Sequence, residues 1–264
     1  MTPILMLGAG RMGGALIEGW RAAGAFAASD LIIREPFANP ALDAAGAAGA
    51  MVNPPDGELA RARTVLLAVK PQVWRQVADE VSAHLAPDAV IVSIAAGVRA
   101  ADISQAFGGR AVARVMPTTA VAVRQGTASI HAADPQAKAR AHALFAPVGT
   151  VVDIADEELM HAATGVSGSA PAYLYAFVEA LEAAGVAAGL PPADSARLAR
   201  STIAGAAALM AAGGEEPAEL RKQVTSPGGT TQAALDVLLG EGGFPELLRE
   251  AVASATRRSK ELGG

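Results

Sequence analysis

The 264-residue sequence contains no cysteine. Disulfides, thiolate nucleophiles and thiolate metal sites are therefore excluded, and a reducing cytoplasm is permitted. Aromatic residues make up only 4% of the chain, which leaves few side chains for stacking on nucleic-acid bases. The formal net charge is -5, whereas a nucleic-acid surface needs clustered lysine and arginine. We expect no nucleic-acid partner.

Long apolar runs are also missing. The longest, from Ile203 to Gly214, is rich in alanine and shorter than the roughly 20 residues of a membrane-spanning helix. The N-terminal residues lack a basic region and lead directly into a glycine turn, so we expect a buried strand at Ile4–Leu7 rather than a signal peptide. We expect a soluble, cytoplasmic protein without a membrane partner.

Short apolar runs alternate with helical stretches in the first part of the chain. Hydrophobic residues make up 52% of the sequence and charged residues 18%, a balance that favours a folded core over disorder. Apolar runs separated by helices are typical of a parallel sheet covered on both faces, so we predict a doubly wound α/β domain of the Rossmann type at residues 1–155. The expected strands are 4–7, 31–33, 65–69, 89–93, 111–115 and 149–154, with helices near 12–23 and 73–83.

The pattern changes near Asp156, after which β-branched runs almost disappear. Apolar residues then recur at steps of three and four, which is typical of amphipathic helices. We predict an all-α domain at residues 156–264, with helices near 170–189, 194–212, 227–239 and 244–262. Because so apolar a helical layer needs a partner surface, we expect it to form the contact of a homodimer.

The segment Gly8-Ala9-Gly10-Arg11-Met12-Gly13 matches the G-x-G-x-x-G pattern between a strand and a helix. In such a turn, Gly8 would permit the tight bend, Gly10 would let a pyrophosphate approach the backbone, and Gly13 would let the helix pack on the strand. The helix start would add free N–H groups. The pattern predicts a dinucleotide site; the alternative is an ordinary strand–helix turn with incidental glycines.

Arg34 and Glu35 follow the second expected strand and bear on the choice of cofactor. An acidic residue there can hold the ribose hydroxyls of NAD, whereas an arginine can accept the 2′-phosphate of NADP. Both residues are present, so the cofactor is left as NADPH or NADH. The alternative is that both are solvated loop charges.

Two further strand ends are expected to line the cofactor crevice. Lys70 would face the cofactor or shape its loop, and Pro71 sits where a helix should begin. Small residues after the next strand leave room for a flat nicotinamide ring. The predicted cofactor-binding residues are Gly8, Gly10, Arg11, Met12, Gly13, Arg34, Glu35, Ala68, Val69, Lys70, Pro71, Ala95 and Gly97.

Residues 224–231 form a second glycine-rich turn. Ser226 is expected to cap a helix, with Pro227 at its first position. Gly228 and Gly229 would remove side chains from the first turn and expose the N–H groups of residues 229–231 to a small anion. A carboxylate fits better than a phosphate, because no lysine or arginine follows within the turn. The alternative is a capped helix packed tightly on a neighbour.

A third glycine-rich turn covers residues 164–173. Ser167 or Ser169 is expected to cap the following helix, with Pro171 near its start. The turn would either line the substrate or act as a hinge between the domains.

Together these stretches resemble the pyrroline-5-carboxylate reductase family. The resemblance lies in residues 8–15, 68–72, 93–98, 115–126, 164–173 and 224–231, in the expected order over nearly the whole chain. It implies a Rossmann domain, a helical dimerisation domain and homodimers assembled into a decamer. It also implies reduction of 1-pyrroline-5-carboxylate to L-proline, the last step of proline biosynthesis, by hydride transfer from NADPH or NADH.

The resemblance also implies the roles of the second turn. Ser226 and the backbone amides of Gly229 and Thr230 would hold the substrate carboxylate, and Thr231 would hydrogen-bond the ring nitrogen as the catalytic residue. The predicted substrate-binding residues are Ser226, Gly228, Gly229, Thr230 and Thr231.

The sequence departs from the family pattern at a few positions that concern the cofactor and the substrate. The usual Met-Pro-Asn-Thr-Pro reads Met-Pro-Thr-Thr-Ala here, with Thr118 and Ala120 as the replacements. Ala170 stands where the family often has glycine, and Glu35 where a residue that binds the 2′-phosphate is often found.

A protonated imine is already electrophilic, so the reaction needs no strong acid, and the cofactor carries the chemistry. The four histidines are scattered, and we expect neither a catalytic histidine nor a metal site. A rival enzyme, a β-hydroxyacid dehydrogenase or another imine reductase, shares the architecture. A hydroxyacid enzyme would need a lysine on the interdomain helix, which residues 173–189 lack. A non-catalytic NAD(P) sensor would not need the open Gly228-Gly229 turn.

Overall fold

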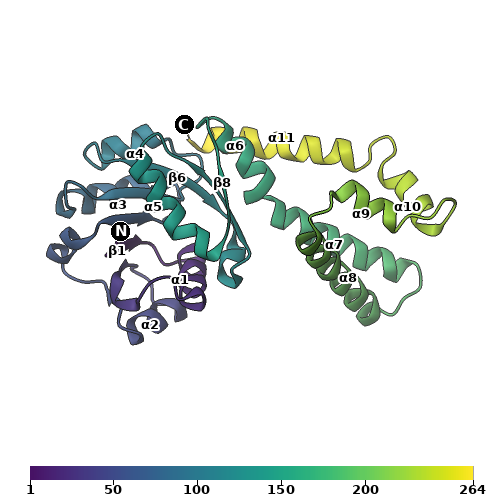
Figure 1. Cartoon of the computed structure of the whole chain (residues 1–264), viewed down its shortest axis with the longest axis horizontal. Coiled ribbons are helices and arrows are strands. Elements are labelled where there is room, and N and C mark those ends of the chain that lie inside the picture. The colour runs from purple at the N-terminus through teal and green to yellow at the C-terminus, as the bar shows by residue number, and fades with distance from the viewer. Residues whose placement is uncertain (264) are drawn as a thin grey trace. The chain divides into compact units, whose positions relative to one another are not determined.

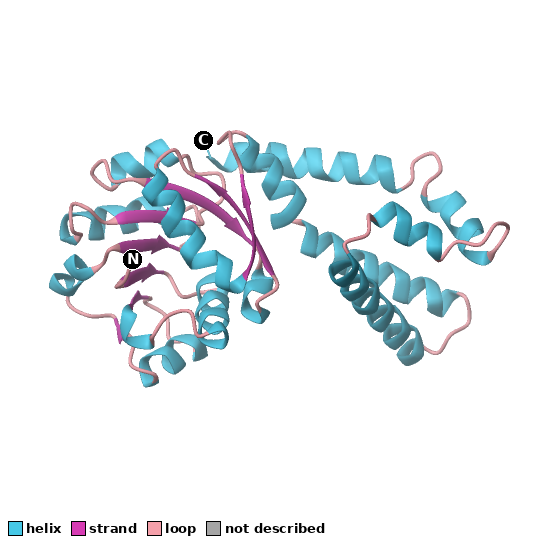
Figure 2. Cartoon of the chain, viewed as in Figure 1, coloured by secondary structure: helices cyan, strands magenta, loops and turns pink. Residues whose placement is uncertain are grey.

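The computed structural model describes residues 1–263 and divides into two compact units (Figure 1). The first unit is Met1–Gly168 with the end of the last helix from Ala253 onward, and the second is Ser169–Val252. Figure 2 shows strands only in the first unit, whereas the second consists of helices and loops.

The first unit is built on an eight-stranded sheet of order β3-β2-β1-β4-β5-β6-β7-β8. The strands β1 to β6 run parallel, which confirms the doubly wound α/β class. The strand β7 was not predicted; it pairs antiparallel with β6, and β8 pairs parallel with β7. The strands are β1 (Ile4–Leu7), β2 (Leu31–Arg34), β3 (Met51–Val52), β4 (Thr64–Leu67), β5 (Val90–Ser93), β6 (Val112–Pro117), β7 (Gly126–His131) and β8 (Gly149–Asp153).

Each face of the sheet carries its own hydrophobic core. Successive side chains of a strand point to opposite faces. Ile4 and Met6 accordingly pack with α1, α2 and α5, whereas Leu5 and Leu7 pack with α3 and α4. Burial on both faces is why these strands read as continuous apolar runs. The helices of this unit are α1 (Arg11–Ala23), α2 (Pro40–Ala47), α3 (Trp74–Val81), α4 (Ala100–Ala106), α5 (Pro135–Phe145) and α6 (Leu159–Ala163).

The second unit is helical, as predicted, with one unpredicted short helix, α9. Its helices are α7 (Ala170–Ala187), α8 (Pro192–Gly213), α9 (Pro217–Gln223), α10 (Thr230–Leu238) and the first part of α11 (Phe244–Gly263). Many large apolar side chains of this unit are exposed within one chain, and α7 and α10 contain no fully buried residue. Among residues 1–263, no helix is long and apolar enough to cross a membrane.

The third glycine-rich turn is helical rather than a loop. Residues Thr164–Gly168 form a π-helical turn that continues α6. The Ser167 hydroxyl donates back to the Ala163 carbonyl at 2.9 Å, and Ser169 precedes α7 without a side-chain capping bond. Ser169 is the N-cap residue of α7 and Pro171 lies in its first turn, as predicted, but no serine hydroxyl makes a capping hydrogen bond, and Ser167 bonds within the preceding turn.

Two buried polar contacts lie near α6, and one of them joins the end of α11 to it. His161 Nδ1 lies 3.0 Å from Ser259 Oγ, and His161 is only 5% exposed. Arg114, also buried, donates to Glu157 at 2.8 Å. Burial alone would raise the pKa of Glu157, but hydrogen bonds from the Ala100 N–H and from Arg114 outweigh it and lower the pKa.

His161 is predicted to make stability depend on pH. Burial, followed by the charge of Arg114, lowers the pKa of His161 below its usual 6.5. The unfolded chain therefore binds the proton first, and the contribution of neutral His161 to stability is lost as the pH falls below about 6.5. Between pH 7.5 and 5.5, the melting temperature of the wild type should fall further than that of His161→Gln, by about 2 °C or more.

The matched control is His84→Gln, which replaces a partly exposed histidine of the same unit. Thermal unfolding followed by circular dichroism at several pH values measures both variants. His84→Gln should keep the pH dependence of the wild type. If His161→Gln kept it as well, His161 would not be the group responsible.

Candidate active site

The carboxyl ends of four neighbouring strands lie in register at one edge of the sheet. Leu7 pairs with Arg34 on one side and with Leu67 on the other, and Leu67 pairs with Ser93. The residues that follow these strands therefore meet at the same edge. Most of the predicted cofactor-binding residues are brought together there, where ligands bind in this architecture.

Gly8 makes the turn after β1. Its φ of 95° lies in the left-handed region, and a Cβ there would lie 2.8 Å from the Ala68 carbonyl oxygen. The Gly8 N–H donates to the Arg34 carbonyl at 2.8 Å. The turn is thus fitted against the ends of both neighbouring strands, and another residue at position 8 would disturb it.

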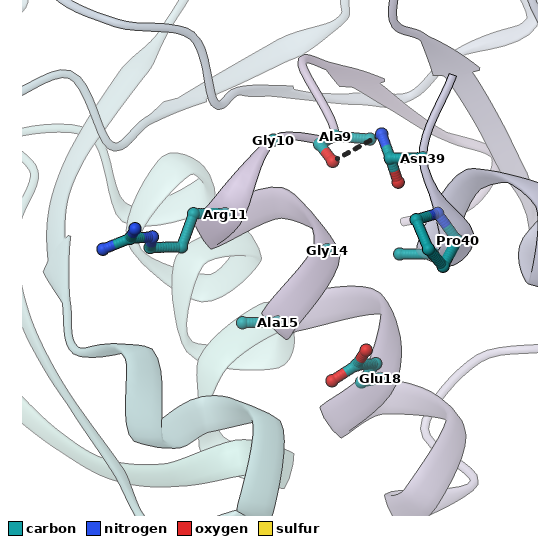
Figure 3. Close-up of a pocket in the computed structure, with 9 residues that line it drawn as sticks. Ala9, Gly10, Arg11, Gly14, Ala15, Glu18, Asn39 and Pro40 are labelled. Carbon is teal, nitrogen blue, oxygen red and sulfur yellow. Dashed lines mark hydrogen bonds between the residues drawn. The ribbon is translucent and has the colours of Figure 1, made fainter. Parts of the chain in front are cut away.

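Gly10 and Gly13 differ in what a side chain would meet. Gly10 precedes the first residue of α1, and a Cβ there would meet nothing within 4 Å. At Gly13 a Cβ would overlap the Gly8 carbonyl oxygen, so Gly13 lets α1 pack onto the turn. The open space at Gly10 adjoins a hollow of about 390 Å³ (Figure 3). It is lined by Ala9, Gly10, Arg11, Gly14, Ala15, Glu18, Asn39, Pro40 and Ala41.

Glu35 is a buried part of this turn, and the alternative of a solvated loop charge is wrong for it. The side chain is 8% exposed. Its carboxylate accepts the Ala9 N–H at 2.8 Å through Oε2 and the Phe37 N–H at 2.9 Å through Oε1. Asn39 donates to the Ala9 carbonyl at 3.2 Å, as Figure 3 shows. The backbone N–H and the backbone carbonyl of Ala9 are therefore both held by the loop after β2.

Arg34 ends β2 and forms an ion pair with Asp56. Its side chain is partly buried, and its Nε has no partner among the described residues. Arg34 is therefore already paired with a carboxylate of its own chain.

Arg11 and Met12 lie in the first turn of α1, and the remaining predicted cofactor residues follow β4 and β5. The prediction that a helix begins at Pro71 is wrong. The Val73 N–H donates to the Lys70 carbonyl at 3.1 Å in a turn, and α3 starts only at Trp74. The Lys70 side chain is exposed. After β5, Ala95 donates its N–H to Ser93 Oγ at 3.2 Å and Gly97 adopts a φ of 81°.

Thr118, one of the departures from the family pattern, forms hydrogen bonds to the neighbouring strand. Its hydroxyl accepts the Thr127 N–H at 3.0 Å, and its own N–H donates to the Thr127 carbonyl at 2.9 Å. Thr118 thus joins the end of β6 to β7. Sequence reasoning did not find this role because the partner strand was not predicted.

The second predicted site lies at the start of α10 in the helical unit. The helix begins at Thr230 with Gly229 as its N-cap, so the expected capping by Ser226 and first position for Pro227 are wrong. The Gly229 N–H donates to the Ser226 carbonyl at 3.0 Å and is not free. The amides of Thr230 and Thr231 open the first helical turn, where N–H groups lack intrahelical partners.

The glycines still keep this helix start clear. Gly228 has a φ of 68°, which a residue with a side chain rarely adopts. A Cβ on Gly229 would overlap Ser226 Oγ, so the absent side chain lets the serine hydroxyl lie beside the helix start. Ser226 and Thr230 are exposed and Thr231 is half-buried. A small anion at this helix start would meet backbone N–H groups and hydroxyls.

These features define the class. A doubly wound sheet, a glycine turn that leads into a helix and a carboxylate after the second strand are typical of a Rossmann-type NAD(P)-dependent oxidoreductase. The open space at Gly10 and the free helix start fit the pyrophosphate of such a cofactor. Within residues 1–263, no group of three or more acidic or histidine side chains could hold a metal ion.

Comparisons with known proteins agree with a Rossmann-type NAD(P)-dependent oxidoreductase and point to one family within that class. The family model "NADP oxidoreductase coenzyme F420-dependent" matches residues 3–97. The model "Pyrroline-5-carboxylate reductase dimerisation" matches residues 157–262. The chain is 41% identical over 265 residues to a pyrroline-5-carboxylate reductase of Synechocystis sp., covering 98% of this chain and 97% of that protein.

Solved structures are similar over the whole chain. A pyrroline-5-carboxylate reductase of Coxiella burnetii has a TM-score of 0.90 at 30% identity, with 100% of this chain and 99% of that one covered. A Plasmodium falciparum pyrroline carboxylate reductase with NADP bound has a TM-score of 0.85 at 26% identity, with coverage of 100% and 98%. The chain belongs to the pyrroline-5-carboxylate reductase family.

Gly10→Ala is predicted to separate cofactor binding from folding. The added methyl group meets nothing in the chain, so the cost in stability should stay below about 1 kcal/mol, the scale of a changed N-cap. The methyl would occupy the space proposed for the pyrophosphate, and the dissociation constant for dinucleotide should rise about tenfold or more. Calorimetric titration and thermal melting measure the two effects.

Gly8→Ala is the contrasting variant, because its methyl would meet the Ala68 carbonyl oxygen at a strained φ. It should lower the melting temperature clearly. Unchanged dinucleotide affinity in Gly10→Ala would remove this turn from the cofactor site.

Proposed function

We propose that this chain reduces 1-pyrroline-5-carboxylate to L-proline with NADPH or NADH, the reaction for which its family is named. The observation that carries the proposal is the helix start at Thr230, where glycines keep side chains away from free backbone amides. An imino acid carries the small carboxylate that such a start favours. In this proposal residues 1–155 bind the cofactor, and residues 156–264 bind the substrate and form the dimer.

On the cofactor side, the pyrophosphate would lie at the start of α1, over Gly10. Glu35 and Arg34 would lie beside the adenine ribose, and the small residues after β5 beside the nicotinamide ring. The proposed cofactor-binding residues remain Gly8, Gly10, Arg11, Met12, Gly13, Arg34, Glu35, Ala68, Val69, Lys70, Pro71, Ala95 and Gly97.

On the substrate side, the Thr230 amide and the Ser226 hydroxyl would hold the carboxylate. Gly228 and Gly229 would keep the approach open; the Gly229 amide would bind the carboxylate only if it released the Ser226 carbonyl. Holding the carboxylate fixes the position of the ring and lowers the entropic cost of reaching the reactive geometry.

Thr231 is the proposed catalytic residue. When bound, the reduced nicotinamide supplies the hydride. The Thr231 hydroxyl lies one residue into α10 and would accept a hydrogen bond from the protonated ring nitrogen, which keeps the C=N bond oriented and electrophilic. As the nitrogen becomes an amine, the same hydroxyl would continue to hold it.

Two of the rival functions, a β-hydroxyacid dehydrogenase and a nucleotide sensor, do not explain both sites; another imine reductase would use both, and the assay with pyrroline-5-carboxylate separates it. A β-hydroxyacid dehydrogenase would need a proton-donating lysine on α7, and the sequence of α7 contains none. A nucleotide sensor would have no use for a second helix start cleared by Gly228 and Gly229.

The oligomer and the location are further parts of the proposal. The exposed apolar side chains of α7, α8 and α10, among them Leu181, Leu209 and Val237, need a partner surface, which supports a homodimer. Assembly of the dimers into a decamer is proposed from the family resemblance alone. Light scattering should give a mass well above the 26.4 kDa of one chain. A chain without cysteine fits the reducing cytoplasm, where we place the enzyme.

The wild-type protein is predicted to oxidise NADPH or NADH only when pyrroline-5-carboxylate is added, with proline as the product. Thr231→Ala should lower kcat/KM by roughly 10- to 100-fold, the scale of one lost transition-state contact. Cofactor absorbance and chromatography of the product measure both results.

Thr230→Ala is the matched control, because it removes the neighbouring hydroxyl and keeps the backbone amide proposed for the carboxylate. It should retain most of the activity. Cofactor oxidation that does not depend on the imine would refute the proposed reaction, whereas an unchanged Thr231→Ala would refute only the role of that residue.

A further inference from the structure

We propose that Glu35 makes this chain prefer NADH to NADPH, an inference that rests on the proposed dinucleotide-dependent function. The carboxylate lies directly after β2, whose end is the position of the adenine ribose in this architecture. It would accept the two hydroxyls of the NADH ribose and repel the 2′-phosphate of NADPH. The family membership alone leaves both cofactors open.

The carboxylate has acceptor capacity left for a ribose. An ionised carboxylate has about four acceptor positions. The N–H groups of Ala9 and Phe37 use one on each oxygen, at 2.8 and 2.9 Å. Each oxygen therefore retains a position for one hydroxyl. A 2′-phosphate offers mainly acceptor oxygens and negative charge, which this group cannot satisfy.

The surrounding contacts keep the carboxylate from moving away. Asn53 holds the Glu35 peptide from both sides: its Oδ1 accepts the Glu35 N–H at 3.0 Å, and its Nδ2 donates to the Glu35 carbonyl at 2.9 Å. Asn39 holds the Ala9 carbonyl while Glu35 holds the Ala9 N–H. Turning the carboxylate out of the site would break its bond to the glycine turn and leave the buried Ala9 N–H unpaired.

The nearby cations are poorly placed to compensate for this negative charge. Arg34, the arginine closest in sequence, is paired with Asp56. Figure 3 shows Arg11 extending away from Asn39 and Pro40, and the hollow beside the glycine turn is lined by a carboxylate of its own, that of Glu18. The Arg34–Asp56 pair is partly exposed and so only weakly held. Asp56 must therefore be included in the test.

Direct binding tests the proposal without any turnover. Dissociation constants for NADH and NADPH are measured by isothermal titration calorimetry on the wild type, Glu35→Gln, Glu35→Ser and Asp79→Asn, an equal change of charge on an exposed residue of α3. We expect the wild type to bind NADH at least about tenfold more tightly than NADPH. Glu35→Gln should bring the ratio close to one, mainly by tightening NADPH, and Asp79→Asn should leave it unchanged.

Two conditions sharpen the result. Added salt should reduce the wild-type preference, because it screens the repulsion between the carboxylate and the phosphate. Adding Asp56→Asn to Glu35→Gln should tighten NADPH further by releasing Arg34.

Three other outcomes would each contradict the proposed preference for NADH. Equal or tighter binding of NADPH by the wild type contradicts it without recourse to any variant. If both Glu35 variants weakened the two cofactors equally and lowered the melting temperature, Glu35 would be a structural residue only. If the wild type bound neither dinucleotide, the proposed function itself would fail with it.

Discussion

The proposed function depends on one physical constraint, the binding of anions by backbone N–H groups at two helix starts. Such a start binds an anion only when no side chain covers it and when the chain before it can bend sharply. The start of α1 meets this demand with Gly8 and Gly10, and the start of α10 with Gly228 and Gly229. Neither site requires a cluster of charged residues, which agrees with a chain that has only 18% of them.

The cofactor side shows how recognition and folding share the same contacts. The glycine turn is fixed by the ends of β2 and β4, by Glu35 on the Ala9 N–H and by Asn39 on the Ala9 carbonyl. Because Gly8 and Ala9 are already held by these bonds, little order remains to be imposed on the turn when a dinucleotide binds to the free N–H groups at the start of α1. In the proposed preference for NADH, the same carboxylate that completes the turn would also set the charge that the ribose meets.

Local sequence patterns predicted most strands and the long helices, but not the long-range contacts or the shorter elements α2, α4, α5, α6, α9 and β3. The apolar runs and the helical periodicity placed β1, α1, α7 and α11 within a few residues, because burial on a face leaves a period in the sequence. The strand β7 was missed, because Gly126–His131 mixes small and polar residues. The bonds of Asp56 to the end of β2 and of Asn53 to the residue after it join residues far apart in sequence and leave no local signal. At Ser226 the capping pattern misled, because Gly228 turns the chain and delays the helix to Thr230.

A crystal structure with NADH and L-proline bound would test the central claim most directly, because L-proline carries the carboxylate and the ring nitrogen of the substrate. The account predicts the proline carboxylate within about 3 Å of the Thr230 amide nitrogen and the ring nitrogen beside the Thr231 hydroxyl. A carboxylate bound away from the start of α10, or a Ser226 side chain that fills the space in front of these amides, would contradict it.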